Sequence, residues 1–154
     1  MRIEISVADE GFARIFIFDN GNSLKLDFVN DVAFRFGIPS ESKIFTRTDN
    51  ILNILSNKVS ALGRYSPKDV VDIVFICEYL SFNWEIIFNN VANKDIWINP
   101  INAVEIIEQF PSDKLKEIIW INKAPSPEWF TGRINQIIPD ILTGRDNSLF
   151  NRKL

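Results

Sequence analysis

The chain of 154 residues contains no histidine and a single cysteine, Cys77. The absence of histidine excludes imidazole as a general acid or base, as the activator of a Ser or Cys nucleophile, and as a metal ligand. One cysteine allows neither an internal disulfide nor a metal site built from several cysteines, and its place in an apolar run predicts an inert core residue. Any chemistry must therefore rest on carboxylates, lysines, arginines and hydroxyl groups, and carboxylates favour hard ions such as Mg²⁺.

Long apolar runs and a strong net charge are also lacking. The longest apolar runs, such as residues 73–77, are far too short to cross a bilayer, and the N-terminus alternates apolar and polar residues, unlike a signal peptide. A formal charge of −3 does not provide the excess of positive charge that strong non-specific binding to nucleic acids requires. We therefore expect a cytoplasmic protein without membrane contact.

Hydrophobic residues make up 46% of the chain and charged residues 24%, the usage of an ordinary globular protein. The pattern of the first thirty residues predicts three strands, because apolar and polar residues alternate over 3–7, 13–18 and 23–28. Turn-forming residues at 9–11 and 19–22 separate these runs and favour a short antiparallel meander.

From about residue 48 the apolar spacing becomes helical. Thr48 or Asp49 can cap a first helix, and Gly63 can end it. The sequence Ser66-Pro67-Lys68-Asp69 opens a second helix, in which Ser66 can be the N-cap and Asp69 can return a capping-box bond. Further helices are predicted at the following positions: 82–93, 100–110, 112–122 and 127–138, with Pro139 marking the end.

Strands followed by helices define the α+β class. We expect a strand-rich part over residues 1–47, a helical bundle packed on it over 48–140, and a surface tail over 141–154. The length favours one compact domain.

Three acidic or basic positions stand out as candidate site residues. The polar, outer arc of the first helix is formed by Asn53, Ser56, Asn57 and Ser60. Lys58 falls within the apolar arc, so its ammonium must snorkel, form a structural ion pair, or bind an anion such as a phosphate. Asp72 has apolar neighbours and needs a cationic partner, for which Lys58 and Arg64 from the preceding helix are better placed than Lys68. Asp27 lies in a strand interior, where Asp is disfavoured; it is either a solvated residue or a metal-binding carboxylate.

These residues together carry a resemblance to a family. Residues 53–76 (NILSNKVSALGRYSPKDVVDIVFI) and the upstream strand 24–28 (LKLDF) resemble the AbiEii/AbiGii-type nucleotidyltransferases, which include toxins of bacterial abortive-infection and toxin–antitoxin systems. The shared pattern is an Asn-Lys helix, a following Ala-Leu and Arg, and then Lys/Arg-Asp-x-x-Asp. The resemblance covers about residues 12–80.

The resemblance implies a nucleotidyltransferase-like fold and the transfer of a nucleotide from a nucleoside triphosphate (NTP) to RNA or protein, with Mg²⁺ as cofactor. Asp27, Lys58 and Asp69 would be the catalytic residues, and Asp27 the metal ligand. Lys58, Arg64 and Asp72 would bind the substrate. The partners implied are the NTP, the acceptor, and an antitoxin or a second copy of the chain.

The family's Gly-Ser loop and Asp-x-Asp pair are not found in this sequence. One carboxylate, Asp27, does not replace two bridging carboxylates, so we expect the chain to be catalytically incomplete by itself. The alternative is a non-enzymatic interaction module, or one half of a split or oligomeric assembly, whose exposed sheet edges and apolar surface are covered by another chain.

Overall fold

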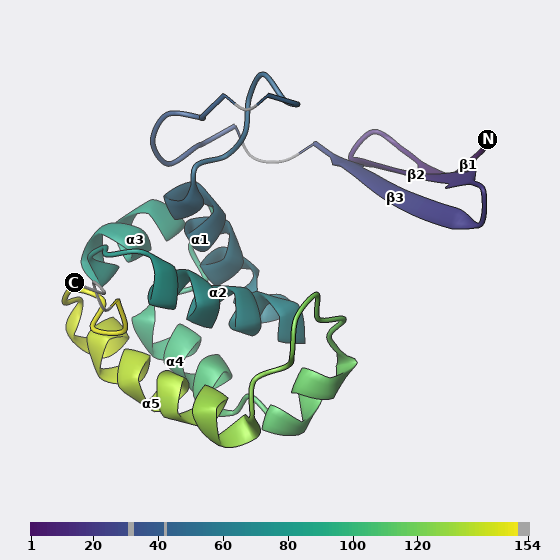
Figure 1. The fold of residues 1–154 in the computed structure, drawn as a ribbon. Coiled ribbons are helices and arrows are strands. Elements are labelled where there is room, and N and C mark those ends of the chain that lie inside the picture. The colour runs from purple at the N-terminus through teal and green to yellow at the C-terminus, as the bar shows by residue number, and fades with distance from the viewer. Residues whose placement is uncertain (31–32, 42, 151–154) are drawn as a thin grey trace. The chain divides into compact units, whose positions relative to one another are not determined.

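The computed structural model describes residues 1–30, 33–41 and 43–150 (Figure 1). Two compact units make up the chain, Met1–Ala33 and Phe34–Leu154, where the sequence favoured one compact domain. The first unit contains the three named strands, and the second contains the helices. The predicted α+β class is therefore confirmed.

The boundary between the units lies after Ala33, earlier than the position near residue 47 that the sequence indicated. Residues 34–50 belong to the helical unit because they are tied to its first helix. The amide nitrogen of Phe36 donates to Asn53 Oδ1 over 2.7 Å, and Asn50 Nδ2 donates to the carbonyl of Phe36 over 2.6 Å.

The first unit is an antiparallel meander in the order β1 (Arg2–Ala8), β2 (Phe12–Asp19) and β3 (Asn22–Val29), as the alternating pattern predicted. Asn20 and Gly21 join β2 to β3 with φ angles of 47° and 80°. Two consecutive positive φ angles are typical of the two-residue hairpin turn whose twist matches the strands. The predicted turn at residues 19–22 is thus confirmed.

The register divides the sheet into two different faces. Ile3 pairs with Ile17, which pairs with Leu24, so the three side chains share one face. Arg14 and Asp27 pair on the opposite face. We call the first the aliphatic face. Asp19 and Asn22 lie at one end of it, and its apolar strand residues up to the irregularity in β1 are Ile3, Ile5, Ala13, Ile15, Ile17, Leu24, Leu26 and Phe28.

The second unit is helical, and most of its helices lie where the sequence placed them (Figure 1). No helix in the described part of the chain is both long and apolar enough to cross a bilayer. The elements are α1 (Ile51–Ser60), η1 (Ala61–Arg64), α2 (Pro67–Tyr79), α3 (Trp84–Val91), α4 (Pro100–Glu108), η2 (Ser112–Glu117) and α5 (Pro127–Thr143).

Three local predictions were wrong. The N-cap of α1 is Asn50, whose side chain accepts from the amide of Asn53, and not Thr48 or Asp49. The predicted helix at 112–122 is only the 3₁₀ turn η2, after which Ile118 is extended. Helix α5 continues through Pro139 to Thr143 and does not end before the proline.

The core of the helical unit is built on α2, which packs against α1 and α5. Because α2 is apolar on most of its circumference, it can be buried from several sides. Cys77 is fully buried in this core, as the sequence predicted. The largest fully buried side chains are Trp84, Phe130, Leu55, Leu62, Ile73, Ile87, Ile107, Ile137 and Ile141.

Residues 144–150 are not the surface tail that the sequence indicated. Asn147 is buried, and its Nδ2 donates to the carbonyl oxygens of Cys77 and Leu80 over 2.7 Å each. Leu149 is also buried, and its amide donates to Asn147 Oδ1. The segment is therefore held on the C-terminal end of α2. The rest of the predicted tail, residues 151–154, lies outside the described residues.

Candidate functional site

Lys58 stands near the end of α1 and reaches across to the first turns of α2. Its Nζ lies 3.1 Å from Asp69 Oδ1 and 2.7 Å from Asp72 Oδ2. Of the readings that the sequence left open for this lysine, the structure forms the ion pair between helices. The cation that Asp72 needs comes from the preceding helix, as predicted.

The two carboxylates have different environments. Asp69 and Asp72 are one helical turn apart on α2 and so point to the same side. The side chain of Asp69 is only 7% exposed, whereas that of Asp72 is 47% exposed. The predicted capping box is not formed, since Ser66 makes no side-chain cap and the Asp69 carboxylate bonds to Lys58.

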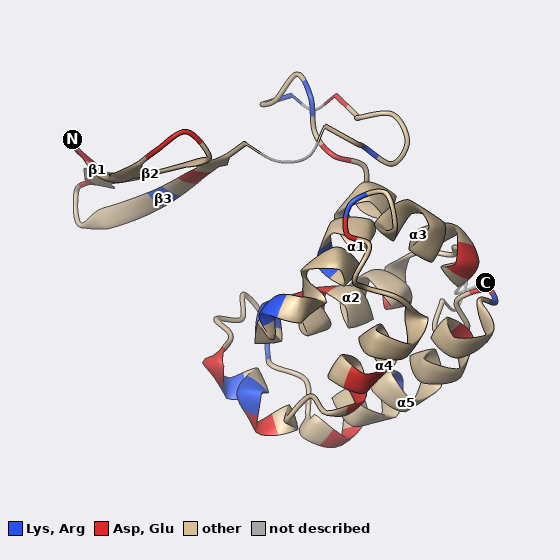
Figure 2. Cartoon of the chain, turned by 180° about the vertical axis from the view of Figure 1, so that it is seen from behind, with Lys and Arg blue, Asp and Glu red and all other residues tan. Residues whose placement is uncertain are grey.

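Arg64 completes a group of four residues that we call the α1–α2 ion cluster: Lys58, Arg64, Asp69 and Asp72. Arg64 Nη2 lies 3.9 Å from Asp69 Oδ2, a long contact, and the side chain is 73% exposed. In Figure 2 a basic segment marks the N-terminal end of α2. The cluster thus combines a fixed, half-buried ammonium with a guanidinium that is open to solvent.

The charge of Lys58 is held constant by its neighbours. Burial lowers the pKa of this ammonium, but hydrogen bonds to Asp72 and Asp69 outweigh the burial and raise the pKa above its ordinary value. Lys58 is therefore a permanent cation at neutral pH. Such a group suits electrostatic stabilisation of an anion and does not suit proton transfer or nucleophilic attack.

Asp27 lies in the first unit and has partners of its own. Arg14 Nε and Nη2 donate to its two carboxylate oxygens over 2.7 and 2.9 Å, and Lys25 Nζ lies 3.5 Å away. The hydrogen bond from Arg14, opposed by desolvation and aided by the charge of Arg14, lowers the pKa of the Asp27 carboxyl. The structure brings the other four candidate residues together, but Asp27 belongs to a different compact unit.

The Mg²⁺ site implied by the resemblance does not fit Asp27 as the structure shows it. Both carboxylate oxygens already accept hydrogen bonds from Arg14. Over residues 1–30, 33–41 and 43–150, no group of three or more His, Cys, Asp or Glu side chains could hold a metal ion. The chemistry of the site therefore depends on its own charged side chains.

Lys94 forms a second polar centre, which the sequence did not predict. Asn53 and Ser56 were expected on the polar, outer side of α1, but both are buried. Lys94 Nζ donates to Asn53 Oδ1 and to Ser56 Oγ over 2.7 Å each, and also to Asn57 Oδ1. The spacing of 53, 56 and 57 puts these acceptors on one helix face. This spacing was the signal in the sequence for a polar contact on that face of α1. No residue nearby in the sequence indicated that Lys94 would supply the contact.

Comparison of the chain with protein-family models, with curated proteins and with solved structures finds no match. The family resemblance therefore stays a prediction. The features that bear on function are the geometry of the ion cluster and of the sheet.

Proposed function

We propose that the chain is a nucleotidyltransferase-like protein of the AbiEii type that binds a nucleoside triphosphate at the α1–α2 ion cluster and is catalytically incomplete by itself. One observation carries this proposal. Lys58, Arg64, Asp69 and Asp72, which the sequence motif spreads over two helices, meet at one place.

The cluster offers a polyphosphate two cations, Lys58 and Arg64, whose charges Asp69 and Asp72 balance in the free chain. Lys58 is a fixed cation, and its position is set from two sides by Asp69 and Asp72. Arg64 is open to solvent, and a guanidinium can bind two phosphate oxygens in parallel. A bound triphosphate would thus be oriented by Arg64 and neutralised by Lys58, while the carboxylates keep the ammonium in place.

Nucleotide transfer needs more than these side chains. A metal-assisted in-line displacement uses carboxylates that bridge the metal ions, and Asp27 is engaged by Arg14. We therefore propose that the missing metal-binding carboxylates are supplied from outside this chain. Once the site is complete, RNA or protein would accept the nucleotide.

Binding and transfer are best measured side by side. Calorimetric titration with each NTP and with inorganic triphosphate is expected to show binding to the full chain. Arg64→Ala and Lys58→Met should each weaken it about tenfold or more, as expected for the loss of a charge-assisted bond. Lys116→Ala is the matched control, because this lysine is 75% exposed and pairs with Asp113, outside the ion cluster. Transfer of an α-phosphate label to RNA or protein by the chain alone would contradict the proposed incompleteness.

A second candidate function rests on the aliphatic face. Its members include Ile3, Ile5 and Leu24, which are 56%, 66% and 54% exposed. A sheet needs to bury one apolar face to be stable. We propose a second copy of the chain as the partner, because the face is apolar except for Asp19 and Asn22 at one end, and Asp19 already lies 3.5 Å from the N-terminal ammonium of the same chain.

The two candidates differ in oligomeric state. Under the second one, sedimentation should show a dimer that Ile3→Lys dissociates. Glu4→Lys places the same side chain on the opposite face and should leave the dimer intact. A monomer at all concentrations contradicts the interaction module and leaves the nucleotide-binding proposal unaffected.

A further inference from the structure

A pocket of about 240 Å³ lies in the helical unit where the start of α2 faces the end of α4 and the start of η2. Most of its wall is apolar, and two polar side chains, Gln109 and Lys114, stand on the side of α4 and η2. Its lining residues are Tyr65, Ser66, Pro67, Val70, Ile106, Gln109, Phe110, Pro111 and Lys114.

The pocket adjoins the α1–α2 ion cluster along the chain. Tyr65 lines the pocket and directly follows Arg64 of the cluster, and Val70 lines the pocket and directly follows Asp69. Consecutive residues of a helix point about 100° apart. The pocket and the cluster therefore occupy neighbouring faces of the first turn of α2, within reach of one ligand.

Tyr65 has an unusual backbone conformation that presents its ring at this place. Its φ and ψ angles are 53° and 32°, in the left-handed region that non-glycine residues rarely adopt. The side chain is 75% exposed although it lines the pocket. An aromatic ring at the rim of an apolar slot is suited to stacking on a planar ring.

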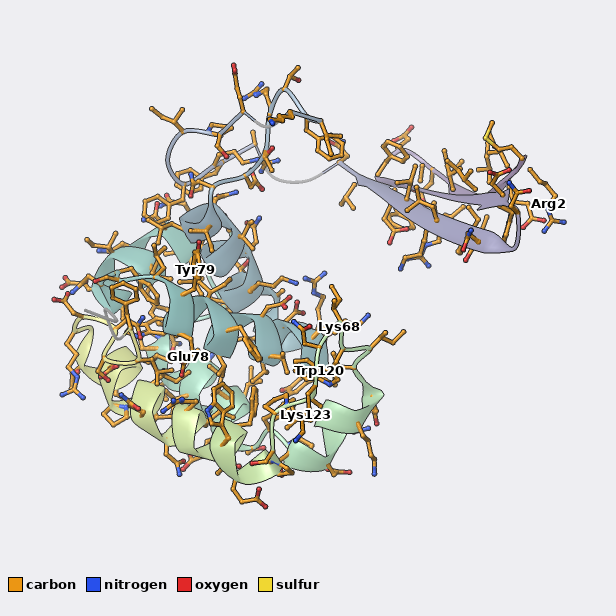
Figure 3. All side chains as sticks on the ribbon, viewed as in Figure 1. Arg2, Lys68, Glu78, Tyr79, Trp120 and Lys123 are labelled. Carbon is orange, nitrogen blue, oxygen red and sulfur yellow. The ribbon has the colours of Figure 1, made fainter. Side chains whose placement is uncertain are left out.

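Two basic residues, Arg64 and Lys68, flank the pocket-lining residues 65–67 along the chain. Lys68 directly follows Pro67 and lies at the N-terminal end of α2 (Figure 3), and the exposed Arg64 directly precedes Tyr65. Ser66 provides no side-chain cap, and only its carbonyl bonds to the first turn of α2, by accepting from the amide of Asp69 over 3.1 Å. A helix N-terminus with two cations beside it attracts an anionic group that is attached to a ring in the pocket.

We infer that this pocket receives the base of a nucleotide, with the ring against Tyr65 and Pro67 and the phosphates toward Arg64 and Lys68. The inference rests on the proposed function and adds the base-binding subsite to it. The Gln109 amide, which can both donate and accept, is positioned to pair with a base edge. The nucleotide is either a free NTP or the terminal nucleotide of an RNA.

The test compares ligands that share the phosphates but differ in the base. The full chain is titrated with each NTP, inorganic triphosphate, each nucleoside and a short oligoribonucleotide. Tyr65→Gly removes the ring while glycine adopts the left-handed backbone freely. Tyr79→Ala is the matched control, because this tyrosine is 73% exposed and lies at the opposite end of α2 (Figure 3).

The wild-type chain should bind at least one NTP about tenfold more tightly than triphosphate, the size expected for stacking of one base. Tyr65→Gly should abolish this difference without changing triphosphate binding, and Tyr79→Ala should retain it. Gln109→Ala, an exposed substitution, should change the ranking of the four NTPs only. Binding of the oligoribonucleotide but of no NTP, with the same loss in Tyr65→Gly, supports the pocket and assigns the base to RNA.

Equal affinity for NTP and triphosphate in the wild type and in Tyr65→Gly overturns the base subsite and leaves the proposed phosphate site standing. Binding of a nucleoside without any binding of triphosphate supports the pocket and contradicts the proposed function. Absence of binding by every ligand to the folded chain overturns both.

Discussion

The ammonium of Lys58 lies 2.7 Å from the Oδ2 atom of Asp72, on the next helix. This contact, with the 3.1 Å contact to Asp69, ties the end of α1 to the beginning of α2. Because Asp69 is nearly buried and Asp72 is half exposed, the same lysine neutralises one carboxylate inside the helix pair and one at its surface. The stability of this pair and the charge of the site can therefore be tested with the same variants.

Lys58→Met is expected to lower the free energy of unfolding by about 2–3 kcal/mol, because it keeps the apolar stem but leaves the buried Asp69 carboxylate without its nearest cation. Asp69→Asn should cost less, since Lys58 keeps Asp72. The two losses should not add in a double-mutant cycle followed by urea denaturation. Lys116→Met should change the free energy of unfolding by under about 0.5 kcal/mol. A loss as large as that of Lys58→Met would show that the ion cluster stabilises the fold no more than an exposed ion pair does.

Asp27 should titrate below its ordinary range, because Arg14 favours the carboxylate. Since the folded pKa is lowered, the stabilising effect of the pair is complete above the unfolded pKa and is lost as the pH falls through the lowered value. Carbon NMR of the side-chain carboxyls is the measurement. Arg14→Ala should return the Asp27 pKa toward that of a free aspartate, and a titration that Arg14→Ala leaves unchanged would disprove the pairing.

Asn147→Ala should destabilise the helical unit by about 1–3 kcal/mol, the usual loss when buried polar groups lose their partner. The variant removes both donors that satisfy the carbonyls of Cys77 and Leu80 at the end of α2. Thermal unfolding followed by circular dichroism measures the loss. Asn122→Ala, on an exposed residue, is the control and should unfold with the wild type.

Cys77 should be unreactive in the folded chain. Burial, with smaller effects from the charges of Asp140 and Glu78, raises the pKa of this thiol far above its usual range. Because only the thiolate attacks disulfide reagents, Ellman's reagent at pH 8 should label the native protein only as fast as it opens, and the urea-unfolded protein at once. Rapid labelling without denaturant would show that α2 is not buried as described.

Local sequence signals were sufficient for the strands and for most helix positions. The alternation in residues 3–28 and the Asn20-Gly21 turn fix the meander, because strand faces and turn angles depend only on neighbouring residues. Pro67 and Pro100 stand at the first positions of α2 and α4 for the same reason. The sequence motif also grouped Lys58 with Asp69 and Asp72, which lie in contact in the structure.

The partners of polar groups were less predictable. Asp69 looked like a helix cap, but it bonds to Lys58, because a charged partner nearby is stronger than a backbone amide. Asn53 and Ser56 looked solvent-facing, but Lys94 covers them.

The sequence by itself determined the α+β class, the meander and the motif that defines the candidate site, since periodicity and turn chemistry act over a few residues. Only the tertiary structure decided which side chains are buried together. It joined Asn147 to the end of α2, engaged Asp27 with Arg14, and formed the pocket beside Tyr65. These features depend on segments that are distant along the chain, where burial compels each polar group to find a partner that the local pattern does not specify.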